Sequence, residues 1–101
     1  MSFRGRSSTR HLLYQSANWD LDVFLCRDET GIEITGQILA RETGGVSQVF
    51  NAVAVLAHHE MFVETTTISP SGEFEFTRVP ETDLHLELFV NSTRLKVGFR
   101  P

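Results

Sequence analysis

Segment 65–80 constrains the fold of this chain more than any other part of the sequence. It contains a β-rich run, a turn built on Pro70 and Gly72, and an alternating stretch in which Phe74 and Phe76 fall on one face. Proline holds φ at a value that suits an early turn position, and glycine accepts positive φ without steric cost. The pattern therefore predicts a β-hairpin whose second strand buries both phenylalanines.

Alternation of apolar and polar residues continues along most of the chain and predicts the fold class. The expected strands span residues 20–26, 32–40, 52–58, 61–68, 73–79, 84–90 and 95–99. Segment 11–18 has no clear period, and we expect it to be irregular or a short helix. Seven short strands with no convincing helical pattern between them predict an all-β fold, an antiparallel seven-stranded β-sandwich.

Several strand positions carry further expectations about packing. Segment 52–58 is apolar on both faces, which predicts a central strand covered on both sides. Gly36 interrupts its strand and indicates a bulge or a close backbone approach. We expect much of the core to come from Trp19, Ile34, Ile38, Phe74, Phe76, Leu84, Leu86 and Leu88.

Composition and charge limit the domain count and the classes of partner. A chain of 101 residues, 41% hydrophobic and 22% charged, is expected to form one globular domain. Residues 1–10 contain three Arg and no acid and are expected to be a flexible basic arm, with residues 11–101 as the sandwich domain. The net charge of -4 belongs to an acidic body that repels phosphate, so no nucleic-acid partner is expected.

Location and redox state follow from what the sequence contains. The longest apolar run, residues 52–57, is too short to cross a bilayer, so no membrane partner is expected. The first ten residues have no apolar signal core, and the single Cys26 cannot form an internal disulfide. We therefore expect a cytoplasmic location.

Five short segments follow one another in an ordered series: the Gly-containing strand 34–38, the small-residue run 51–56, the threonines 65–67, the Phe-containing run 72–76 and the loop 79–80. Over residues 32–90 this order resembles the carboxypeptidase regulatory-like family, whose members share the transthyretin-like sandwich. Most members are noncatalytic modules for folding support, carbohydrate contact or protein contact. The resemblance therefore implies a binding role.

The N-terminal third carries a second resemblance. Segments 10–14, 20–22 and 36–37 are similar to small bacterial proteins that accompany sigma-factor and anti-sigma regulators or related signalling proteins. The resemblance implies a regulatory protein partner.

Three groups of residues have side chains of catalytic or metal-binding types, and each group is also suited to a plain structural role. His58, His59 and Glu60 supply zinc-ligand types. Neighbouring side chains of a strand point to opposite faces, so the two histidines cannot reach one ion unless a bulge or turn intervenes, and we expect a solvated strand end and no metal. Asp20 and Asp22 lie on one face of a strand, at a spacing suited to a general acid and base or to a calcium ion. We favour the alternative that these carboxylates contact the basic arm.

The Arg27 cation next to Cys26 favours the thiolate form of a cysteine. A catalytic cysteine also needs a histidine partner, and the sequence places none near it, so we expect a structural role for Cys26. Segment 91–93 matches a glycosylation acceptor and is expected to be a turn.

The sequence therefore predicts a noncatalytic protein-interaction module, an accessory or regulatory subunit of a bacterial signalling system, with no cofactor. The alternatives are a carbohydrate or small-ligand binding domain and, less favoured, a metal-dependent enzyme. A homo-oligomer through a strand edge is a further possibility. Interfaces are anchored by arginine and bulky apolar side chains, so the expected partner-binding residues are Arg10, Leu12, Leu13, Tyr14 and Trp19. The same residues are also suited to closing one end of the sandwich core.

Overall fold

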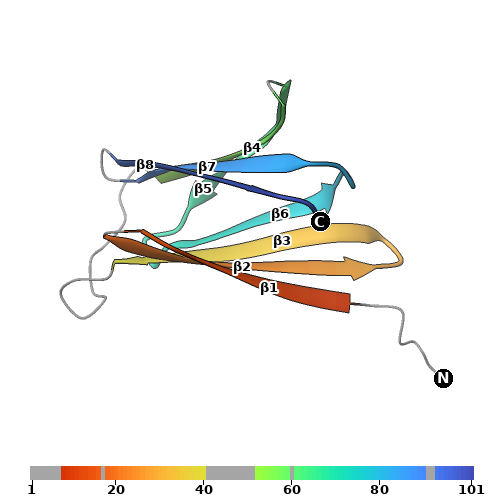
Figure 1. Ribbon diagram of the computed structural model, residues 1–101, viewed down its shortest axis with the longest axis horizontal. Coiled ribbons are helices and arrows are strands. Elements are labelled where there is room, and N and C mark those ends of the chain that lie inside the picture. Colours follow the sequence, from red (N-terminus) through yellow and green to blue (C-terminus); the bar gives the residue numbers. More distant parts are fainter. Residues whose placement is uncertain (1–7, 17, 41–51, 60, 91–92) are drawn as a thin grey trace.

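The computed structural model describes residues 8–16, 18–40, 52–59, 61–90 and 93–101, which form two packed layers of strands (Figure 1). None of these residues belongs to a helix that is long and apolar enough to span a membrane. The eight strands of this part of the chain are β1 (Ser8–Gln15), β2 (Trp19–Asp28), β3 (Gly31–Ala40), β4 (Ala52–His58), β5 (Met61–Ile68), β6 (Glu73–Val79), β7 (Leu84–Val90) and β8 (Thr93–Phe99).

Each layer is a four-stranded antiparallel sheet. The first sheet has the order β1-β2-β3-β6, and the second has the order β5-β4-β7-β8. The predicted all-β antiparallel sandwich is confirmed, with eight strands in place of seven.

The additional strand corrects the expectation for segment 11–18. Residues 11–15 are neither irregular nor helical, because they belong to β1, which pairs with β2 along its whole length, from Ser8 opposite Arg27 to Gln15 opposite Asp20. Its alternation is hard to see in the sequence because Leu13 is apolar and yet points outward, where its side chain is 58% exposed. β1 also includes residues 8–10 of the predicted arm, and residues 1–7 lie outside the described part of the chain.

The turn at 69–72 has the predicted chemistry but joins different strands. Gly72 has a φ of 89° and donates its amide to the carbonyl of Ser69 at 2.8 Å. However, β5 pairs with β4 and β6 pairs with β3, so the turn crosses from one sheet to the other. The predicted hairpin is therefore wrong, because local turn chemistry does not specify which strand each arm will pair with.

The core lies between the two sheets and contains all eight of the residues expected there. Phe76, Ile34, Leu86 and Leu88 are 0% exposed, and the least buried of the eight, Trp19, is 8% exposed. The predicted central position of β4 is also confirmed, since it lies between β5 and β7. Within the described residues, however, the opposite sheet covers β4 from one side only.

Candidate protein interface

β4 presents apolar side chains to both sides of the second sheet. Ala52, Ala54 and Leu56 point into the core and are at most 3% exposed. Val53 and Val55 alternate with them, point outward and are half-buried. A two-layer sandwich has a single core between its sheets, so the opposite sheet cannot cover these outward valines.

Neighbouring strands extend this apolar outer side. Val53 lies directly opposite Phe89 of β7, and Ala57 lies directly opposite Phe62 of β5. Phe89 is 41% exposed and Phe62 is 66% exposed. Because directly paired residues share one face of a sheet, these side chains lie on the same outer face, where Val55 is paired with the polar Thr65 and Glu87. We call this surface, made of Val53, Val55, Ala57, Phe62 and Phe89, the β4 face.

The end of the β4–β5 hairpin extends the β4 face beyond the sandwich. The hairpin rises on the side of the second sheet that faces away from the first sheet (Figure 1). Met61 begins β5 at this end and is 70% exposed, the largest exposed fraction among the large hydrophobic side chains of the described residues. Hydrophobic side chains thus project from both the sheet and the hairpin.

Polar side chains border the β4 face on both sides. Thr65 and Thr67 lie along β5, and Glu87 and Lys96 form a cross-strand pair on β7 and β8. Arg94 donates to the Glu87 carboxylate from Nε at 2.7 Å and from Nη2 at 2.6 Å. An apolar centre with a polar and charged rim is the usual composition of a protein–protein interface.

The five residues expected to bind a partner lie on β1 and at the start of β2, where strand alternation separates them. Leu12 and Tyr14 are half-buried against the core, and Trp19 is buried within it. Leu13 points outward from the same strand, and Arg10 is exposed. The set therefore does not form one surface, and a role in partner binding stays a prediction for it.

Tyr14 connects the edge strand of the first sheet to that of the second. Its hydroxyl donates to the carbonyl of Gly98 on β8 at 3.4 Å. Burial raises the pKa of the Tyr14 hydroxyl above its ordinary value, against a smaller opposing effect of the Arg10 charge. The neutral hydroxyl is thus favoured where the two edges meet.

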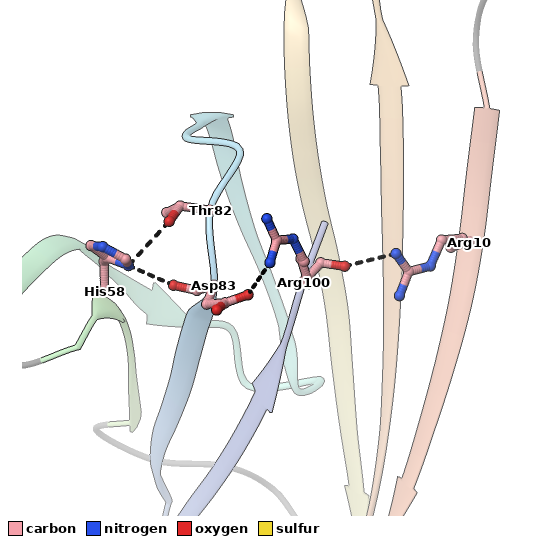
Figure 2. A network of polar contacts seen from close by, with 5 residues as sticks. All are labelled: Arg10, His58, Thr82, Asp83 and Arg100. Carbon is pink, nitrogen blue, oxygen red and sulfur yellow. Dashed lines mark hydrogen bonds and ion pairs between the residues drawn. The ribbon is translucent and has the colours of Figure 1, made fainter.

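A chain of polar contacts closes the same side of the sandwich (Figure 2). Arg10 donates from Nη1 to the carbonyl of Arg100 at 2.7 Å, and Arg100 contacts the Asp83 carboxylate at 3.2 Å. His58 Nδ1 lies 2.7 Å from the Asp83 carbonyl and 3.3 Å from Thr82 Oγ1. A carbonyl oxygen is an acceptor, so Nδ1 carries the proton and His58 donates. The network connects β1, β4, the loop before β7 and the C-terminal end.

The two adjacent histidines do not diverge as expected. Their ring centroids lie 4.1 Å apart, because His59 adopts a φ of 55° and turns the chain at the end of β4. The prediction that strand geometry separates His58 and His59 is therefore wrong. Glu60 lies outside the described residues, within which no group of three or more His, Cys, Asp or Glu is placed to hold a metal ion.

Asp20 and Asp22 both lie on the outer side of β2 but have different neighbours. Asp22 Oδ1 lies 3.1 Å from His11 Nε2, and Asp20 is opposite Gln15 and Leu39. The neighbour of Asp22 is a side chain of β1 and not of the segment expected to be a basic arm.

Cys26 is half-buried on the same side of β2, opposite Thr9 and Glu33. Arg27 contacts the Glu81 carboxylate at 2.5 Å. The predicted turn at 91–93 lies outside the described residues except for Thr93, which begins β8.

Sequence reasoning found β4 but missed the exposed surface around it. The available signal was the continuous apolar run of residues 52–57. In a two-layer fold, the side chains on one face of this run pack in the core. The apolar side chains on its other face can be buried only by a further segment or by a partner.

Comparison with known proteins leaves the family open. No family model matches this chain, and no curated protein matches it. Among solved structures, the GAE domain of GGA2p from Saccharomyces cerevisiae is similar, with 18% sequence identity and a TM-score of 0.48 over 91% of this chain and 97% of that chain. None of these comparisons assigns the chain to the carboxypeptidase regulatory-like family or to the bacterial regulators.

Proposed function

We propose that this chain is a noncatalytic protein-interaction module that binds a partner protein through the β4 face. The observation that carries the proposal is the apolar outer side of β4, which is half-buried and which the opposite sheet does not cover, with the exposed Phe62 and Phe89 beside it. Large contiguous apolar surfaces on a folded domain commonly mark binding sites. Covering a large apolar side chain such as Phe62 contributes about 1.5–3 kcal/mol, which gives the surface a driving force for association.

The alternative of a carbohydrate-binding domain has less support. It depends on Trp19 and Tyr14 as exposed aromatic platforms, and Trp19 is 8% exposed while Tyr14 is half-buried. The β4 face does expose phenylalanines, but its centre consists of Val53, Val55 and Ala57, which offer no side-chain hydrogen bonds to sugar hydroxyls. Its apolar centre suits a protein surface better.

The proposal includes the setting expected from the sequence. We propose that the partner is a regulatory protein of a bacterial signalling system and that the two meet in the cytoplasm. The support is the resemblance of segments 10–14, 20–22 and 36–37 to small bacterial regulators. The β4 face supports the position of the binding surface independently of this resemblance.

Site-specific photo-crosslinking in the native cell tests the proposed interface. A photoreactive residue at Val55 is expected to capture a discrete partner protein. The matched control is the same residue at Glu29, which is exposed in the turn between β2 and β3 and remote in sequence from every strand of the second sheet. Capture at position 29 equal to that at position 55, or no capture at position 55, contradicts the proposal.

A further inference from the structure

A second surface lies on the first sheet, on the side facing away from the core. An open hollow of about 530 Å³ is found there, at the β3–β6 side of the sheet. It is lined by outward-facing residues of the first sheet, by Gly36 and the core residue Phe74, and by Thr67 of β5 in the second sheet. The outward-facing residues are Phe24, Thr35, Gln37, Glu73 and Glu75, and the lining contains no lysine or arginine.

Phe24 forms an aromatic wall of the hollow. Its ring stacks on the ring of His11, with a centroid distance of 4.3 Å and an interplanar angle of 4°. His11 lies on β1, on one side of β2, and Thr35 of the hollow lies directly opposite Phe24 on β3, on the other side. Since His11 covers the ring face toward β1, the second ring face is directed toward the hollow. Phe24 is 42% exposed.

Two carboxylates line the opposite side of the hollow. Glu73 and Glu75 are exposed on β6, opposite Gln37 and Thr35 of β3. Ser71 Oγ donates to Glu73 Oε1 at 3.3 Å and directs that carboxylate. In the described part of the chain, no lysine, arginine or histidine forms an ion pair with either glutamate. The hollow therefore presents negative charge opposite an aromatic ring.

We propose that this hollow binds an arginine side chain of an extended segment of a partner protein. A guanidinium group is planar, stacks on aromatic rings and donates to carboxylates through a fork of N–H groups. Phe24 provides the ring, and Glu73 and Glu75 provide the acceptors on the other side. The amide of Gln37 and the hydroxyl of Thr35 supply neutral hydrogen-bonding groups beside them.

Charge complementarity selects this occupant over other ligands. Phosphate groups and anionic lipid surfaces are repelled by Glu73 and Glu75. A lysine ammonium neutralises the same charge but lacks the planar group that stacks on Phe24. Thr67 of β5 borders both surfaces, but none of the five residues of the β4 face lines the hollow, so either proposal can fail without the other.

Nuclear magnetic resonance titration of the full chain tests the site. The probe is the peptide acetyl-Gly-Arg-Gly-amide, and the comparison peptides carry citrulline or lysine in place of arginine. Citrulline retains the planar shape but has no charge. We expect the arginine peptide to shift the amide signals of residues 35–37 and 73–75, the lysine peptide to bind more weakly, and the citrulline peptide to produce no saturable shift.

Matched variants distinguish binding in the hollow from nonspecific attraction of a cation to the acidic surface of the protein. Phe24→Ala and Glu75→Gln are each expected to weaken arginine-peptide binding at least fivefold. Glu33→Gln is the control, because Glu33 is exposed on the same sheet opposite Cys26 and does not line the hollow. Amide spectra of each variant confirm that it is folded. Equal losses for Glu33→Gln and Glu75→Gln, comparable binding of the citrulline peptide, or shifts scattered over the surface overturn the proposal.

Discussion

Gly36 of β3 lies directly opposite Phe74 of β6, and the phenylalanine ring occupies the space where a side chain at Gly36 would be. A Cβ atom placed on Gly36 would lie 2.1 Å from Cζ of the ring. The glycine that interrupts the alternation of β3 thus makes room for a buried aromatic ring of the neighbouring strand. This is the close approach that a glycine within a strand predicts.

Replacing Gly36 with alanine is therefore expected to destabilise the fold. Overpacking of a well-packed core costs about 1–3 kcal/mol, since the ring must shift against its neighbours. Denaturant unfolding of Gly36→Ala measures the loss. Gly98→Ala is the control, because its Cβ would lie 3.4 Å from His85 Cδ2, an ordinary contact, and should leave stability unchanged or slightly higher. Equal effects of the two substitutions would refute the packing role of Gly36.

Phe76 is expected to be among the most stabilising side chains of the core. It is 0% exposed and packs edge-on against Phe74, with ring centroids 6.2 Å apart. Phe76→Ala and Phe74→Ala should each lower the free energy of unfolding by about 3–5 kcal/mol. By contrast, Phe62→Ala, at a side chain that is 66% exposed, should change it by about 0.5 kcal/mol or less. A loss below about 1 kcal/mol for both core variants would mean that β6 does not bury this face.

Tyr14 is expected to make stability fall at alkaline pH. The raised pKa of the folded state means that unfolded chains release the hydroxyl proton first, near the ordinary value of 10.0. The contribution of Tyr14 is therefore fully present below pH 10.0 and is lost as pH rises through the folded pKa. Unfolding experiments across this range should show a steeper loss for the native chain than for Tyr14→Phe. The chain has 1 Tyr, so phenolate absorbance reports this group alone. Parallel losses in the two proteins would contradict the expectation.

Leu12 and Leu13 are neighbours with opposite orientations and form a matched pair. Leu12 packs against the core, whereas Leu13 is 58% exposed. Leu12→Ala is expected to lower stability by about 1–2 kcal/mol, in proportion to its partial burial, and Leu13→Ala by no more than about 0.5 kcal/mol. Thermal melting compares the two variants. If Leu13 binds a partner, as predicted, its alanine variant loses affinity while remaining as stable as the native chain. The reverse order of stabilities would contradict the orientation of β1.

Local patterns predicted the strands better than their pairing. The alternation around Phe74 and Phe76 and the chemistry of Gly72 depend on neighbours in sequence, and both were predicted correctly. The pairing of β6 with β3 depends on contacts between distant segments, and turn residues carry no information about it. For the same reason the sequence suggested a hairpin where the chain crosses between sheets.

The candidate interface was beyond sequence reasoning for a related physical reason. An apolar residue such as Val55 gives the same sequence pattern whether the outer face of its strand packs against another layer of the fold or against a partner protein. The strand order of the second sheet, and the exposure of Phe62 and Phe89 beside β4, distinguish the two cases. At the N-terminus, the exposed Leu13 concealed the alternation that would have predicted β1.

The central claim is that the β4 face binds a protein, and the affinity of the crosslinked partner for surface variants tests it most directly. Truncating an interface anchor commonly costs about 2 kcal/mol or more, roughly a thirtyfold loss of affinity. Phe62→Ala and Phe89→Ala should each reduce affinity on this scale with unchanged melting temperatures, whereas Leu39→Ala, at an exposed side chain of the first sheet that lines neither proposed site, should reduce it much less. Full affinity in both β4-face variants, or an equal loss in Leu39→Ala, would contradict the account.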